Sequence, residues 1–191
     1  FDDRYLFTAT LRADASSKFG ANNRWGYFPS FAAAWRISSE KFMEGSQEWL
    51  SNLKLRLGYG EVGNSNIGTY QFGSTMVAFP SAFGTAYRMS NNANPDLKWE
   101  ASVQYNAGVD ISLFNSRVNL TFDAYYKTTR DLLLRPSVSP VLGGSGWTDI
   151  MTPMMNIGKV DNKGIDISLD THNISGKDFN WTSNLTFSLN R

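Results

Sequence analysis

Three glycines form a motif that could bind a dinucleotide. Gly58, Gly60 and Gly63 spell G-x-G-x-x-G in the run GYGEVG, directly after a segment of alternating polarity. Such a site also needs a following helix, because the helix N-terminus holds the pyrophosphate. The stretch that follows, NSNIGTYQFG, has no helical amphipathic period. We therefore expect no nucleotide site, and we interpret the glycines as positions where a strand bends.

The single histidine is the other candidate for chemistry. His172 shares the polar side of an alternating segment with Asp166 and Asp170. A metal site would need more nitrogen or sulfur ligands, and the chain contains no cysteine. Serine and aspartate are common in the sequence, so nothing selects a Ser-His-Asp triad. We expect no catalytic residue, no metal and no cofactor, and we interpret His172 as a hydrogen-bonded structural residue.

Composition limits the kinds of partner. The 191 residues include 18 basic and 17 acidic side chains, a net charge of +1, so no global field would attract nucleic acid. The longest apolar run, Phe31 to Trp35, is far shorter than the roughly 18 residues of a membrane helix. Aromatic residues make up 14% of the chain, which favours sheets and membrane-interface belts.

The elements that position these residues are predicted to be strands. From Leu97 to Leu113 the odd positions are apolar or small and the even positions are polar or glycine, which is the two-residue period of a strand. Six further segments alternate in the same way: 5–17, 27–38, 53–62, 118–129, 163–173 and 179–190. Most are ten or more residues long, enough for a tilted strand to cross an apolar band of about 25 Å. The pattern predicts an all-β, antiparallel transmembrane barrel segment of about seven strands.

Alternation also selects the charged side chains of the polar face. We expect these residues to line the barrel lumen and to form a wall network with neighbouring strands or with the contents of the barrel. The candidates for the lumen wall are Arg12, Asp14, Arg36, Lys54, Arg56, Lys98, Glu100 and Asp110.

The connections between the strands alternate in length. Tight turns at 114–117 and 175–178 and a longer link at 39–52, in which Ser39 could cap a helical turn, alternate with the connections 18–26, 63–96 and 130–162. Outer-membrane barrels show the same alternation, with short periplasmic turns and long external loops. Aromatic residues gather near both ends of the strands, which indicates two membrane interfaces. The long loops carry further aromatic side chains, and we take Tyr70, Tyr87 and Trp147 as candidate substrate contacts. Packing within the loops themselves is an equally good interpretation.

Four runs of the sequence resemble a known family. They are YFPSFAAAWRISSEKFM (27–43), WLSNLKLRLGYGEVGN (49–64), NPDLKWE (94–100) and NIGKVDNKGIDISL (156–169). In sequence, order and spacing they closely resemble the barrel of SusC/RagA-type TonB-dependent transporters of Bacteroidetes. The resemblance implies a plugged barrel of 22 strands in the outer membrane. It also implies a SusD-like surface lipoprotein and TonB as partners, the inner-membrane proton gradient as the source of energy, and an oligosaccharide or peptide as ligand.

On this resemblance, residues 1–191 are expected to be part of the barrel domain, with the plug and the TonB-contacting segment outside them. Surrounding outer-membrane lipid would be a further partner, and no enzymatic activity is expected. Two alternatives remain open from the residues alone. One is a passive porin or surface-adhesion barrel, and the other is a soluble carbohydrate-binding β-sandwich.

Overall fold

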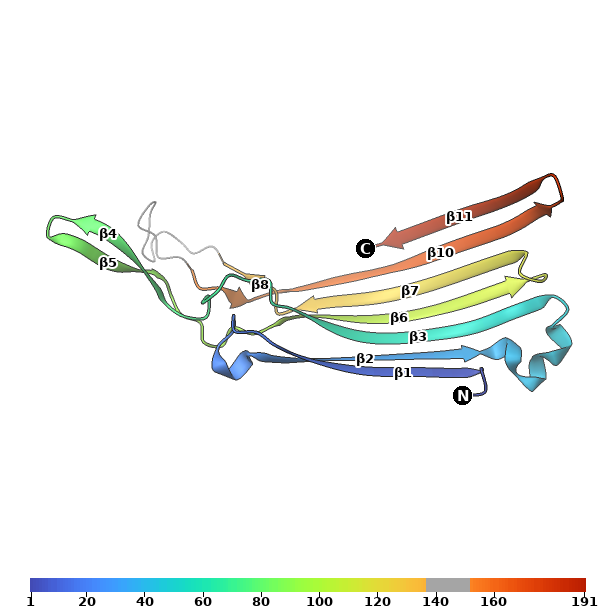
Figure 1. The fold of residues 1–191 in the computed structure, drawn as a ribbon, viewed down its shortest axis with the longest axis horizontal. Helices are drawn as coiled ribbons and strands as arrows, with labels where there is room; N and C mark the ends of the chain where they lie inside the picture. The colour runs from blue at the N-terminus through green and yellow to red at the C-terminus, as the bar shows by residue number, and fades with distance from the viewer. Residues whose placement is uncertain (137–151) are drawn as a thin grey trace.

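The computed structural model describes residues 1–136 and 152–191, and its main element is one antiparallel sheet of seven strands. The strand order is β1-β2-β3-β6-β7-β10-β11, so each strand pairs with the next long strand along the chain (Figure 1). The long strands are β1 (Tyr5–Ala15), β2 (Trp25–Arg36), β3 (Leu50–Asn64), β6 (Glu100–Leu113), β7 (Val118–Arg130), β10 (Lys159–Ser175) and β11 (Asn180–Asn190). This single sheet confirms the predicted fold class and excludes a two-sheet sandwich.

Register gives the sheet two chemically different faces. Phe31, Tyr59, Tyr105 and Tyr126 are successive partners across β2, β3, β6 and β7 and therefore share one face, which we call the apolar face. One position along, the partners Ala32, Gly58, Asn106 and Tyr125 share the opposite face, which we call the polar face. The predicted alternation is thus continuous across the sheet.

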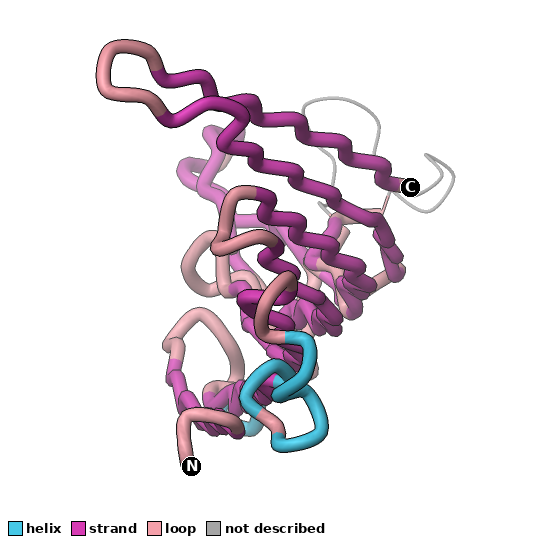
Figure 2. The backbone as a smooth tube through the Cα atoms, turned by 90° about the vertical axis from the view of Figure 1, so that its right-hand side faces the viewer, coloured by secondary structure: helices cyan, strands magenta, loops and turns pink. Residues whose placement is uncertain are grey.

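The sheet has little core of its own. Large side chains of the apolar face are open to the surroundings, and Phe7 and Leu185 are 78% and 67% exposed. The most deeply buried large side chains, Phe19 and Leu97, lie in connections beyond the strand ends. Viewed from the short-turn end, the sheet is twisted and curved (Figure 2). Such a sheet needs lipid on one face and other material on the opposite face.

The two ends of the sheet differ as predicted. The tight turns at 114–117 and 176–179 and the longer link at 37–49 lie at one end (Figure 1). The connections at 16–24, 65–99 and 131–158, the last two the longest of the chain, lie at the other end. The link between β2 and β3 holds two 3-10 helices, η2 (Ile37–Ser39) and η3 (Lys41–Ser46). The predicted helix cap at Ser39 was wrong, because Glu40 precedes η3 and neither helix has a side-chain cap.

The long connections contain structure that the sequence pattern did not predict. A hairpin of β4 (Thr75–Ser81) and β5 (Gly84–Asn91) projects beyond the sheet (Figure 1). A short ribbon pairs β8 (Leu133–Leu134) with β9 (Met155–Asn156), and a 3-10 helix, η1 (Ala21–Asn23), lies between β1 and β2. Among residues 1–136 and 152–191, no helix is long and apolar enough to cross a membrane.

Candidate functional site

An ion network crosses three strands in the middle of the polar face. Arg56 of β3 donates from Nε and Nη2 to Asp110 of β6 at 2.8 and 2.9 Å. The same Nη2 donates to Asp123 of β7 at 2.9 Å. One guanidinium thus joins two carboxylates on neighbouring strands and ties β3, β6 and β7 together. Asp123 was absent from the predicted wall candidates, although alternation places it on the polar side of segment 118–129, the signal by which the other candidates were chosen.

Gly108 makes this network possible. It lies between Arg56 and Asp123 in the register, and a Cβ atom there would overlap Asp123 Oδ1 and lie 2.8 Å from Arg56 Nη2. Gly58 and Gly60 lie further along β3 on the same face, where they line a hollow of about 510 Å³ together with Gln104 and Lys127. These glycines leave space over the sheet. They form no phosphate-binding loop, because β3 continues through all three glycines of the motif.

The remaining wall candidates are distributed along the polar face. Arg12 and Asp14 form an ion pair at 2.6 Å on β1, and the Arg12 guanidinium lies 5.5 Å from the centre of the Phe28 ring. Lys54 is the register partner of both Arg36 and Asp110. That this face lines a lumen stays a prediction.

The last two wall candidates belong to the rim at the long-connection end. Lys98 pairs with Asp131 at 3.1 Å, and Glu100 accepts hydrogen bonds from Asn64 Nδ2 and Leu133 N at 3.1 Å each. Asn156 accepts from Lys98 N at 2.9 Å and donates to the carbonyls of Lys98 and Asp131 at 2.8 and 2.9 Å. The runs 94–100 and 156–169 are therefore in direct contact and join the β3–β6 and β7–β10 connections into one rim.

A small hydrophobic cluster supports this rim. Phe19, Ile67 and Leu97 are buried against one another, with Trp99 and Phe72 among the side chains packed against them. Trp99 also contacts the Phe28 ring edge-on at a centroid distance of 5.5 Å. A Cβ atom on Gly63 would overlap Phe28, so the third glycine of the motif accommodates this ring. The cluster fixes the base from which the β4–β5 hairpin extends.

The β4–β5 hairpin presents exposed aromatic and apolar side chains beyond the rim. Tyr87 on β5 is 68% exposed, and Tyr70, in the turn before β4, is 70% exposed with φ of +58°. The buried Asn91 anchors the hairpin, since its side chain accepts from Thr75 N at 2.8 Å and donates to Gly73 O at 2.9 Å. The third predicted substrate contact, Trp147, lies outside the described residues.

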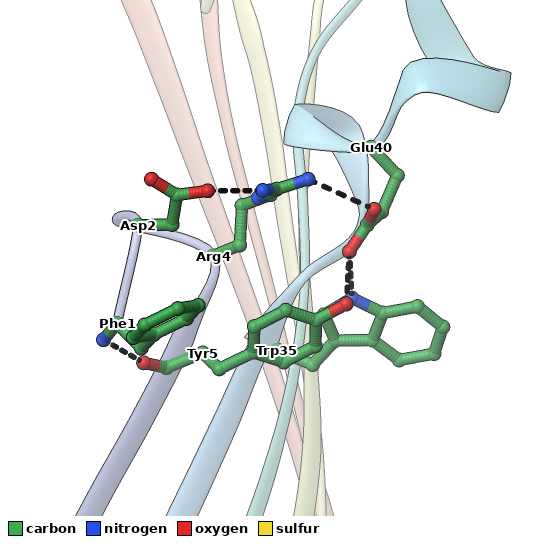
Figure 3. A network of polar contacts seen from close by, with 6 residues as sticks. All are labelled: Phe1, Asp2, Arg4, Tyr5, Trp35 and Glu40. Atoms are coloured by element: carbon green, nitrogen blue, oxygen red, sulfur yellow. Dashed lines mark hydrogen bonds and ion pairs between the residues drawn. The ribbon is translucent and has the colours of Figure 1, made fainter.

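A second polar cluster lies at the short-turn end (Figure 3). Glu40 accepts hydrogen bonds from the Tyr5 hydroxyl at 2.5 Å and the Trp35 indole at 3.0 Å, and it pairs with Arg4 at 3.4 Å. The Tyr5 and Trp35 rings are stacked. The bonds from Tyr5 and Trp35 hold the pKa of the Glu40 carboxyl below its usual range. Sequence reasoning missed Glu40, because its partners are two outward-facing aromatic residues on different strands.

Within residues 1–136 and 152–191, no three His, Asp or Glu side chains are grouped to hold a metal ion. His172 lies on β10, where its backbone N–H donates to Arg117 O at 2.7 Å.

The sheet has long antiparallel strands, one exposed apolar face, one polar face with charges in networks, and its two longest connections at the same end. Together these features define a transmembrane β-barrel wall. The whole chain, residues 1–191, matches the family described as TonB dependent receptor-like, beta-barrel. The chain belongs to this family of outer-membrane proteins, which are transporters rather than enzymes.

Individual relatives match nearly all of the chain. The TonB-dependent receptor SusC of Bacteroides thetaiotaomicron is 38% identical over 200 residues, which cover 98% of this chain and 19% of SusC. A TonB-dependent receptor of Formosa agariphila is 38% identical over 196 residues, covering 100% of this chain and 18% of that receptor. The structure of the RagAB peptide importer in its closed-closed state matches with a TM-score of 0.87 and 32% identity, over 100% of this chain and 20% of the solved chain. The chain thus spans about a fifth of its relatives and is similar to the SusC and RagA type throughout.

Proposed function

We propose that this chain supplies wall and external loops to a TonB-dependent importer of oligosaccharides or peptides. The observation that carries the proposal is the similarity of 98% of the chain to SusC and of the whole chain to the RagAB importer. A SusD-like surface lipoprotein is the proposed partner at the long-connection end. TonB is proposed to drive import with the energy of the inner-membrane proton gradient, acting through segments outside these residues.

The geometry supports different roles for the rim at the long-connection end and for the polar face of the sheet. At the long-connection end, a cross-linked rim holds a hairpin with exposed Tyr87, and aromatic faces beside short polar groups suit stacking on sugars. On the polar face, Arg12 pairs with Asp14, and Arg56 pairs with both Asp110 and Asp123, so several of the wall charges are already engaged with one another. We favour an oligosaccharide as the ligand, with Tyr70, Tyr87 and Trp147 as contacts. RagAB, by its description, imports peptides.

Uptake by the full-length parent protein tests this function. Cells that carry or lack the parent gene are supplied with panels of fluorescent oligosaccharides and oligopeptides, with and without a protonophore. We expect gene-dependent uptake of an oligosaccharide that stops when the proton gradient is removed. Uptake that persists without the gradient would favour the passive porin alternative, and uptake of peptides alone would overturn the choice of ligand.

Ligand contact by the hairpin is tested in the same cells. Tyr87→Ala should weaken binding of the imported ligand about tenfold, since stacking contributes roughly 1–2 kcal/mol. The matched control is Tyr27→Ala, because Tyr27 is similarly exposed but lies on the apolar face of β2. Equal affinity of Tyr87→Ala and the unaltered parent would remove Tyr87 from the site.

A further inference from the structure

A long groove crosses the apolar face of the sheet. It has a volume of about 910 Å³ and extends over β1, β2, β3, β6 and β7. On each of these strands it is lined by two side chains of the apolar face and by the residue between them, such as Tyr105, Asn106 and Ala107 on β6. The groove therefore runs across the strands, on the face opposite the ion network.

The two sides of the groove have different chemistry. One side is a row of aromatic side chains, in which the Phe31 and Tyr59 rings are 6.1 Å apart and the Tyr59 and Tyr105 rings are 5.2 Å apart. The other side is built mainly from small residues, because Ala33, Leu57, Ala107 and Ala124 are successive partners across four strands. The small side chains create the hollow, and the aromatic rings wall it on the side of the long connections.

Positive charge lies where the aromatic row meets β10. Lys163 is the register partner of Tyr126, and it exchanges backbone hydrogen bonds of 2.9 and 2.8 Å with Arg191. Neither Lys163 nor Arg191 makes an ion pair with a described residue, although neighbouring Lys159 pairs with Asp161 at 3.1 Å. The apolar groove thus leads to two cations on the same face of the sheet.

We propose that this groove binds one acyl chain of a phosphorylated glycolipid from the outer leaflet, with a lipid phosphate at Lys163. The apolar face of an outer-membrane barrel is in contact with lipid, which sets the occupant apart from aqueous ligands. The aromatic row lies toward the long connections, the external side of such barrels, so the neighbouring leaflet is the outer one. The unpaired cations are complementary to a lipid phosphate. The proposal does not depend on which nutrient is imported.

Native mass spectrometry of the full-length parent in detergent tests the site, with lipid A as the probe and phosphatidylethanolamine as the comparison lipid. We expect one tightly bound lipid A per barrel. Ala107→Leu with Ala124→Leu fills the groove, and Lys163→Gln removes a charge worth about fivefold in affinity. Both variants should weaken lipid A binding, and their combination should abolish it. The matched controls are Val109→Leu, on the apolar face outside the groove, and Lys41→Gln in the turn.

Three outcomes would overturn the proposal. Equal binding of both lipids would show only a general lipid layer around the barrel. Unchanged lipid A affinity in the groove-filling variant would place the lipid elsewhere. A parent dimer that dissociates when the groove is filled would identify a second barrel as the occupant. Uptake of nutrient by the same variants separates this site from the transport function, since a failure of import leaves lipid binding measurable.

Discussion

At the scale of single residues, the ion network on the polar face depends on a glycine, Gly108, which leaves space for the charged side chains. Arg56 can bridge Asp110 and Asp123 only because Gly108 occupies the space between them. All three charged side chains are between a quarter and two fifths exposed, so solvent screens part of their attraction. The network therefore contributes more to the register of β3, β6 and β7 than to the free energy of folding.

Gly108→Ala in the parent protein should displace the Arg56 guanidinium and lower stability by about 1–2 kcal/mol. Gly58→Ala is the matched control, because a Cβ atom there would have its nearest neighbours 3.7 Å away in the Asn106 side chain. The measurement is the temperature at which the folded barrel loses its compact band on unboiled gels. Equal melting of the two variants would contradict the proposed role of the space at Gly108.

Glu40 makes the short-turn end sensitive to acid. Its pKa is lowered first by the Tyr5 hydroxyl and then by the Trp35 indole. A carboxyl with a lowered pKa stabilises the fold above its unfolded pKa of about 4.3 and loses this effect as the pH falls through the folded value. We expect the parent to lose stability on acidification below about pH 4.3 more steeply than Glu40→Gln, measured by urea unfolding at several pH values. Parallel pH profiles would contradict this role of Glu40.

At the scale of elements, the side chain of Asn156 on β9 joins two connections at the rim. Its amide pairs with both backbone groups of Lys98 and also binds the carbonyl of Asp131. Asn156→Asp removes the two donated hydrogen bonds, which are together worth about 1–3 kcal/mol. We expect faster proteolysis of the long connections in intact cells. Asn162→Asp is the control, since Asn162 is an exposed residue of the paired strand β10, and similar cleavage of both variants would contradict the bridge.

The strands were predictable because burial of one face in lipid imposes a strict period of two, which Leu97 to Leu113 shows clearly. The β4–β5 hairpin was not, because Pro80 lies within β4 and the turn glycine, Gly84 with φ of +107°, follows the two tip residues Ala82 and Phe83 instead of lying between the strands as in an Asn-Gly turn. The first residues of β10 were also missed, since Lys159 and Asp161 put charge on the apolar face.

The candidate site was predictable only one strand at a time. Alternation selected Arg56 and Asp110, but the bond to Asp123 depends on the pairing of strands far apart in sequence. The run that begins at Asn156 was recognised through its resemblance to a family. Its contact with Lys98 could not be predicted, because it depends on the relative position of two long connections. The sequence pattern therefore could not predict contacts between side chains on different strands or connections.

At the scale of the whole molecule, the sheet is a wall between two environments. Its apolar face carries exposed Phe, Leu and Tyr side chains, and its polar face carries paired charges. A sheet with these faces is stable only when the apolar face is in lipid and its outer strands are paired. The barrel wall is consequently the claim on which the proposals for import and for the lipid groove both depend.

Spin-label accessibility along β6 of the parent tests this claim most directly. The chain contains no cysteine, so single labels can be placed within this segment at successive positions from Ser102 to Ser112. We expect collisions with lipid-soluble oxygen to peak at odd positions such as Val103 and Val109. Collisions with a water-soluble nickel complex should peak at even positions such as Gln104 and Asp110. Oxygen collisions that peak at even positions, or accessibility without a two-residue period, would contradict the barrel wall.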